Sequence, residues 1–130
     1  GETVGQILVQ IREHYPDVLV MGEVSTIEEA KAVIPMGFDL ISTTLSGYTR
    51  ESIGVKSVNL ELIRMICQIT EIPVIAEGKI AREEEAVMAL EAGAHAVVVG
   101  TSITRPEIIT QRYAGALYRF GGKQQGDRAI

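Results

Sequence analysis

Hydrophobic positions along the chain form short continuous runs that alternate with stretches of helical spacing. Four apolar runs predict strands at residues 18–23, 38–44, 73–77 and 96–100. Five segments with apolar residues every three or four positions predict helices at residues 3–14, 25–34, 58–70, 82–93 and 106–120. Because the strands are apolar throughout instead of alternating with polar residues, they indicate a parallel sheet covered by helices.

The strand–helix–strand unit is repeated. Residues 19–44 align with residues 73–100 with one small gap, which places Glu23 opposite Glu77 and Gly37 opposite Gly93. Such a repeat is typical of a (β/α) barrel or of a doubly wound sheet. A complete eight-unit barrel needs about 250 residues, whereas this chain has 130.

We therefore expect an α/β fold of TIM-barrel type with four strands, the carboxyl-terminal half of a barrel. It is expected to occupy residues 1–120, followed by a frayed tail at residues 121–130. A small open α/β sheet is the alternative.

Candidate chemistry lies at the carboxyl ends of the strands, where parallel α/β sheets bind their ligands. Glu77 and Glu23 each end an apolar strand, and a partly desolvated carboxylate there is suited to proton transfer. Gly78 and Gly100 follow neighbouring strands and let the backbone approach an anion closely. The alternatives are a loop-capping role for Glu77, or its pairing with Lys79.

A phosphate site is predicted at the same edge of the sheet. Barrel phosphate sites use the loops after the last two strands, which here contain Gly78, Lys79, Gly100 and Thr101. Arg105 lies just beyond and carries the planar fork that binds phosphate. An ordinary tight turn at Gly100 and Thr101 is the alternative.

Composition narrows the range of partners. The net charge is −5 and the isoelectric point is about 5.0, without a basic stripe. We therefore expect neither nucleic acid nor an anionic membrane as a partner.

The cysteine and histidine content bears on compartment and metal binding. Cys67 is the single cysteine, so no disulfide can form within the chain, which favours the cytoplasm. His14 and His95 have no ligand-spaced partners, so no metal is expected.

Three motifs carry a family resemblance. The sequences TTLSGYT (residues 43–49), PVIAEGKI (73–80) and AVVVGTSITRP (96–106) resemble the carboxyl-terminal half of the N-acetylmannosamine-6-phosphate 2-epimerase family. These are (β/α)8-barrel enzymes of sialic acid breakdown. The resemblance implies epimerisation at C2 of N-acetylmannosamine 6-phosphate, giving N-acetylglucosamine 6-phosphate, by removal and return of a proton and without a cofactor.

The resemblance also assigns roles to residues. Glu77 assists the proton transfer, and Arg105 with the backbone around Gly78 and Gly100 holds the 6-phosphate. Glu23 stands where the family has an aspartate. The family's principal acid/base is a lysine of the amino-terminal half, which no lysine of this chain replaces, so we expect this chain alone to be inactive.

Two other functions stay open. One is a catalytically silent half-barrel that binds a phosphorylated ligand. The other is a phosphate-binding barrel enzyme of the flavin-mononucleotide type, which a flavin absorbance spectrum would identify. A four-stranded parallel sheet has two open edges and apolar faces, so we also expect a homo-oligomer, namely a dimer.

Overall fold

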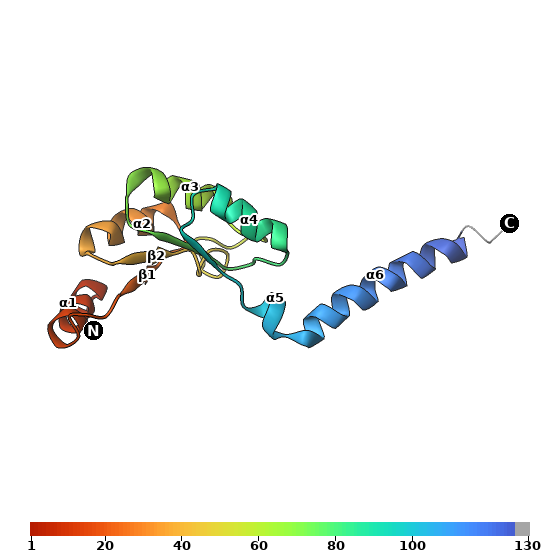
Figure 1. Cartoon of the computed structure of the whole chain (residues 1–130), viewed down its shortest axis with the longest axis horizontal. Coiled ribbons are helices and arrows are strands. Elements are labelled where there is room, and N and C mark those ends of the chain that lie inside the picture. Colours follow the sequence, from red (N-terminus) through yellow and green to blue (C-terminus); the bar gives the residue numbers. More distant parts are fainter. Residues whose placement is uncertain (127–130) are drawn as a thin grey trace. The chain divides into compact units, whose positions relative to one another are not determined.

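The computed structural model describes residues 1–126, and the side-chain surroundings of residues 1–121. The last part of the predicted tail, residues 127–130, lies outside this range. Within it, the strands are β1 (Met21–Glu23), β2 (Leu40–Ser42), β3 (Val74–Glu77) and β4 (Ala96–Val98). They form one parallel sheet in the order β1-β2-β3-β4 (Figure 1).

The chain divides into two compact units, one from Gly1 to Val98 and one beginning at Val99. The first holds the sheet with α1 (Val4–His14), α2 (Ile27–Val33), a 3₁₀ turn η1 (Ile34–Met36), α3 (Leu60–Ile69) and α4 (Glu83–Glu91). The second holds α5 (Thr101–Thr104) and α6 (Pro106–Gly126). The assignment of residues 1–120 to a single half-barrel domain stays a prediction.

The sheet has the arrangement of a barrel and not of a doubly wound fold. Each strand pairs with the next strand in the sequence, and α2, α3 and α4 lie together over one face (Figure 1). A doubly wound sheet would reverse its strand order and carry helices on both faces. The core between the sheet and the helices is buried and includes Ile41 of β2, Val74 of β3 and, from α3, Leu62, Ile63 and Ile66.

The sequence repeat corresponds to a repeated helix start. The carboxylate of Glu29 accepts hydrogen bonds from the backbone N–H groups of Ser25 (2.6 Å) and Thr26 (3.3 Å). Glu85 binds the N–H groups of Ala81 (2.7 Å) and Arg82 (3.1 Å) in the same way. Both glutamates therefore cap the free N–H groups at the start of a helix. Glu85, one of three consecutive glutamates in the first turn of α4, thus has a structural role.

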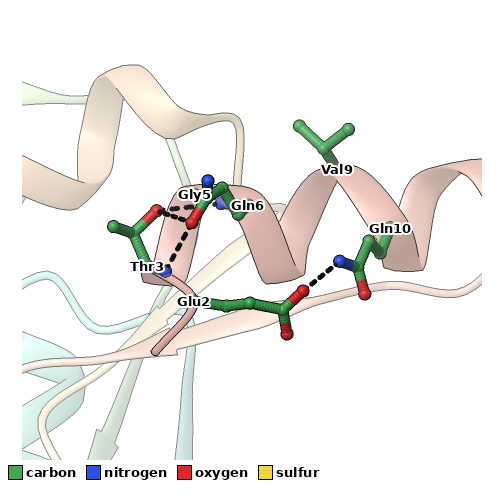
Figure 2. Close-up of a pocket in the computed structure, with 6 residues that line it drawn as sticks. All are labelled: Glu2, Thr3, Gly5, Gln6, Val9 and Gln10. Atoms are coloured by element: carbon green, nitrogen blue, oxygen red, sulfur yellow. Dashed lines mark hydrogen bonds between the residues drawn. The ribbon is translucent and has the colours of Figure 1, made fainter.

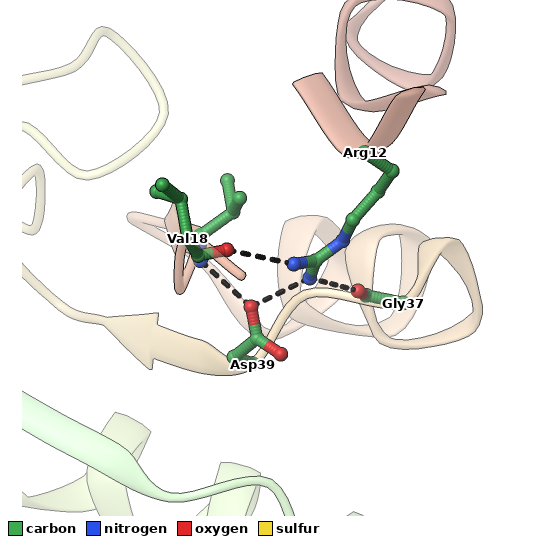
Figure 3. A network of polar contacts seen from close by, with 5 residues as sticks. Arg12, Val18, Gly37 and Asp39 are labelled. Carbon is green, nitrogen blue, oxygen red and sulfur yellow. Dashed lines mark hydrogen bonds and ion pairs between the residues drawn. The ribbon is translucent and has the colours of Figure 1, made fainter. Parts of the chain in front are cut away.

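An ionic cluster ties α1 to the amino ends of β1 and β2 (Figure 3). Arg12 donates to the carbonyls of Val18 (2.9 Å) and Gly37 (3.1 Å), and its Nη2 lies 2.5 Å from Oδ2 of Asp39. The same Oδ2 accepts from the N–H of Val20 at 2.7 Å. The Val20 hydrogen bond and the Arg12 guanidinium together hold the pKa of Asp39 below its ordinary value.

Several elements differ from the sequence prediction, and β2 and β4 are shorter than predicted, ending at Ser42 and Val98. Strand β1 begins at Met21 instead of at residue 18: the carbonyl of Val18 accepts from Arg12 and the N–H of Val20 donates to Asp39 Oδ2, while only the carbonyl of Val20 bonds to backbone N–H groups, those of Asp39 and Leu40. The turn α5 was not predicted; it forms because the carbonyl of Gly100 accepts from the N–H groups at residues 103 and 104. Helix α6 continues past the predicted end at residue 120. Among the described residues, no helix is long and apolar enough to cross a membrane.

Candidate functional site

Hydroxyl groups from the end of β2 hold Glu77 at the end of β3. Thr44 donates from Oγ1 to Oε2 of Glu77 at 2.9 Å, and Ser42 Oγ lies 2.5 Å from Thr44 Oγ1. The hydroxyl hydrogen of Thr44 is used in the hydrogen bond to Glu77. The hydroxyl of Ser42 is therefore the donor to Thr44 Oγ1. The hydroxyl of Thr43 accepts from the backbone N–H of Glu77 (3.2 Å) and donates to its carbonyl (3.1 Å). Both the backbone and the carboxylate of Glu77 are therefore positioned by β2.

These hydroxyl residues were not among the predicted site residues. Ser42 and Thr43 are almost fully buried, and buried hydroxyls require hydrogen-bond partners. The signal in the sequence was a run of three hydroxyl residues closing an apolar strand. Among the described residues, Oε1 of Glu77 accepts no hydrogen bond, so it is the carboxylate oxygen open to a ligand.

Glu23 lies on the same face of the sheet as Glu77. It is paired in register with Ser42, which is paired with Ile75, two residues before Glu77. Side chains alternate along a strand, so all of these point away from α2, α3 and α4. Two strand spacings of about 4.8 Å and an offset of two residues separate the two carboxylate-bearing backbone positions by roughly 12 Å. The two glutamates therefore stand on the same face of the sheet but on strands that are not adjacent.

Gly78 brings the backbone after β3 close to the end of β2. Its φ is +97°, and a Cβ at this position would lie 3.0 Å from the carbonyl oxygen of Thr44. Any other residue would meet both an unfavourable backbone angle and a close contact. The structure thus explains the glycine by its packing against the end of β2, and the approach of a ligand to Gly78 stays a prediction.

The Lys79 side chain points to the β2–α3 loop, which we define as residues 43–59. Its Nζ donates to the carbonyl of Gly47 at 2.9 Å and to the carbonyl of Val55, and lies 4.7 Å from the ring centroid of Tyr48. The ammonium group is therefore engaged by the loop. A phosphate contact by Lys79 is thus a prediction about its backbone N–H.

The remaining predicted residues belong to the second unit. The carbonyl of Gly100 accepts from the N–H and the hydroxyl of Thr104, both at 3.1 Å, and Thr101 begins α5. Nε of Arg105 lies 2.7 Å from Oε1 of Glu107, and both side chains are more than half exposed. Any anion bound by Arg105 therefore competes with Glu107 for the guanidinium.

A surface hollow beside α1 is separate from the predicted site residues. The hollow is open (Figure 2) and is lined by Glu2, Thr3, Gly5, Gln6, Val9 and Gln10. Its polar groups bond to one another: Thr3 with Gln6 as a helix cap, and Gln10 with Glu2 at 2.5 Å.

Within residues 1–126, no three His, Cys, Asp or Glu residues are grouped so as to hold a metal ion.

Comparison with known proteins links this geometry to one family. Residues 2–119 match the family model described as "Putative N-acetylmannosamine-6-phosphate epimerase". A curated relative of that description from Caldanaerobacter subterraneus subsp. tengcongensis is 53% identical over 113 residues, covering 87% of this chain and 48% of the relative. One from Latilactobacillus sakei is 40% identical over 119 residues, covering 90% and 52%.

A solved structure is similar in fold as well as in sequence. It is that of N-acetylmannosamine-6-phosphate 2-epimerase from Clostridium perfringens, with a TM-score of 0.81 and 43% identity. The alignment covers 89% of this chain and 50% of that chain. The chain thus spans about half the length of the curated relatives that it matches.

Proposed function

The chain belongs to the N-acetylmannosamine-6-phosphate epimerase family, and on this premise we propose that it forms the carboxyl-terminal half of an epimerase active site. The reaction converts N-acetylmannosamine 6-phosphate to N-acetylglucosamine 6-phosphate by removing the C2 proton beside the aldehyde and returning it on the other face. One observation carries this proposal. The Glu77 carboxylate ends β3 with Oε2 fixed by Thr44 and with Oε1 unbonded among the described residues.

Proton transfer at C2 needs a group within hydrogen-bond reach of that proton. A carboxylate held by one oxygen keeps the other in a defined place, which supports Glu77 as the group that assists this transfer. Glu23, on the same face, is the second carboxylate proposed for the site. The resemblance assigns the principal acid/base to a lysine outside the matched half, so little turnover is expected from this chain alone.

The 6-phosphate is proposed to bind at Gly78, the backbone N–H of Lys79, Gly100 and Thr101, with Arg105 as its cationic partner. Glu77 and Val98 are paired in register at the ends of β3 and β4. The segments that contain the two glycines therefore leave neighbouring strand ends. This is the place at which barrels bind phosphate, and it supports the proposal together with the family motif around Arg105.

The phosphate proposal is tested with two substitutions of opposite effect. Arg105→Ala should weaken binding of N-acetylmannosamine 6-phosphate by about tenfold or more, because a charged hydrogen-bond partner is lost, while binding of N-acetylmannosamine stays unchanged. Glu107→Gln should strengthen phosphate binding a few-fold at most, because an exposed ion pair is weak. Titration calorimetry measures both. Equal losses for the two sugars would assign Arg105 to another role.

The catalytic proposal is tested by exchange of the C2 proton in deuterated water, followed by NMR. The chain should be mixed with the amino-terminal half of a family member, and exchange should then exceed that of either part. Glu77→Gln should abolish the gain, whereas Glu91→Gln, at the exposed end of α4, should keep it. Ligand binding without exchange in every mixture would instead support a silent binding module.

We further propose that two copies of the chain associate and act in the cytoplasm. The face of the sheet opposite the helices carries Met21 and Val98, which are 37% and 41% exposed. In the described sheet, β1 and β4 each pair on one side only. Exposed apolar surface and unpaired strand edges both favour association. The acidic net charge argues against nucleic acid or an anionic membrane surface as a partner, and the family supports a phosphorylated amino sugar instead.

A further inference from the structure

Lys79 has an unusual backbone for a residue with a side chain. Its φ is +58°, and it follows Gly78 at +97°, so two successive residues adopt left-handed conformations. For a residue other than glycine this conformation is unfavourable and persists only where surrounding contacts hold it. Here the contacts are made by the ammonium group, at the β2–α3 loop.

The ammonium joins two positions that lie well apart in the loop. It donates to the carbonyls of Gly47 and Val55, and the exposed ring of Tyr48 lies over it. An ammonium has three donors and no acceptor, and an aromatic face adds a favourable electrostatic contact. The cation thus bridges two carbonyl groups whose oxygens would otherwise repel each other.

Gly47 is adapted to this bridge. Its φ is +82°, and a Cβ there would meet Nζ of Lys79 and lie 2.6 Å from the carbonyl oxygen of Val55. No side chain fits between the bridged groups. The loop therefore closes around the ammonium itself, in space that a larger residue at position 47 would fill.

The bridge also bears on the carboxylate of the proposed site. Lys79 lies two residues after Glu77, and the loop that it closes begins at Thr43 and Thr44, which bind Glu77. The backbone of Gly78 fits closely against the carbonyl of Thr44. Movement of the loop would therefore displace Thr44 from the carboxylate that it holds.

We propose that Lys79 is a positioning residue, whose ammonium closes the β2–α3 loop and thereby holds Thr44 against Glu77. The inference deepens the proposed function and rests on it for the importance of Glu77. It assigns the side chain of Lys79 to the loop and not to the sugar phosphate. A role for its backbone N–H in phosphate binding is compatible with this assignment.

Amide hydrogen exchange of the full chain tests the closure of the loop. The N–H groups of Gly47 and Val55 donate within the loop, to Ser52 Oγ (2.7 Å) and Ser52 O (3.3 Å). Lys79→Met keeps the length of the side chain but removes the donors. It should speed exchange of these amides about tenfold, as expected for losing a charged hydrogen bond, and Lys79→Arg should restore most of the protection.

Two other variants make the result specific. Gly47→Ala should open the loop with Lys79 still present, because the added Cβ occupies the position of the ammonium. Lys31→Met, at an exposed lysine of α2, should leave exchange in the loop unchanged. Unchanged protection in Lys79→Met would overturn the proposal.

The link to Glu77 is tested without an activity assay. The side-chain carboxyl ¹³C signal of Glu77, assigned through Glu77→Gln, should shift in Lys79→Met and return in Lys79→Arg. A signal that does not move while the loop opens would reduce Lys79 to a purely structural residue and refute the positioning role.

Binding of inorganic phosphate distinguishes the two possible roles of the Lys79 side chain, which are to close the β2–α3 loop or to contact the phosphate. The affinity for inorganic phosphate, given by its Kd, should weaken less in Lys79→Met than in Arg105→Ala, because the ammonium is bound by the loop and the guanidinium is the group proposed to contact phosphate. A loss as large as that in Arg105→Ala would overturn the assignment to the loop. If the unmodified chain binds no phosphate, the phosphate part of the proposed function fails, and the exchange and ¹³C results still decide the role of Lys79.

Discussion

Thr44 donates a 2.9 Å hydrogen bond to Oε2 of Glu77, and Ser42 lies 2.5 Å behind Thr44 in the same chain of hydroxyl groups. This chain of hydrogen bonds runs from the end of β2 to the end of the neighbouring strand β3. It orients one carboxylate oxygen with protein groups and leaves the other to face the space in front of the sheet.

Removing the Thr44 hydroxyl tests how much this chain of hydrogen bonds contributes to catalysis by Glu77. Thr44→Val keeps the branched shape but leaves Glu77 without its donor, and a hydrogen bond to a charged group contributes about 1.5–3 kcal/mol. In the epimerase assembled with an amino-terminal half, kcat should fall roughly 10- to 100-fold. Thr110→Val, at an exposed position on α6, is the control. An unchanged kcat would show that Thr44 does not act on Glu77.

Substitution of Gly78 should destabilise the first unit. Gly78→Ala combines a left-handed backbone, which costs on the order of 1–3 kcal/mol, with a Cβ 3.0 Å from Thr44 O. Gly54→Ala is a matched comparison, because Gly54 has φ +107° but nothing within 4 Å of the added Cβ. Urea denaturation should therefore show a larger loss for Gly78→Ala. Equal losses would mean that the contact with Thr44 is unimportant.

The Asp39 cluster should make stability depend on acid pH. In the folded chain the pKa of Asp39 lies below its ordinary value of 3.8, because its carboxylate accepts a hydrogen bond from the Val20 N–H and lies beside the Arg12 guanidinium. The unfolded chain thus binds the proton more tightly, so the stabilisation is complete above pH 3.8 and is lost as the pH falls through the lower folded pKa. Asp39→Asn should flatten this part of the stability–pH curve, measured by thermal unfolding. A curve of unchanged slope would locate the acid sensitivity elsewhere.

Sedimentation tests the proposed dimer. The unmodified chain should sediment as a dimer at micromolar concentration, because the sheet face opposite the helices exposes Met21 and Val98 and the outer edges of β1 and β4 are unpaired in the described sheet. Val98→Asp places a charge on that face and should give monomers. Ile53→Asp, at a loop residue that is 82% exposed, should leave the dimer intact. A compact monomer of the unmodified chain would refute the proposal.

The sequence by itself determined the order of the strands and helices and the edge at which Glu23, Glu77 and Gly78 lie. Hydrophobic periodicity is a local property, so the chain displays it before any contact is known. The repeat likewise predicted equivalent helix ends, and Gly37 and Gly93 both adopt left-handed conformations. Strand ends were less well predicted, because the carbonyl of Val18 and the N–H of Val20 bond to the side chains of Arg12 and Asp39, which the local pattern did not indicate.

Only the tertiary structure decided which groups act on Glu77. Thr44 lies 33 positions away in the sequence, and the register of β2 against β3 brings it to the carboxylate. The direction of the Lys79 side chain depends on a left-handed φ, which no residue pattern indicated. Contacts between distant segments arise from strand pairing and loop closure, so the composition of each segment predicted a carboxylate at the sheet edge but not the hydroxyls and the loop that position it.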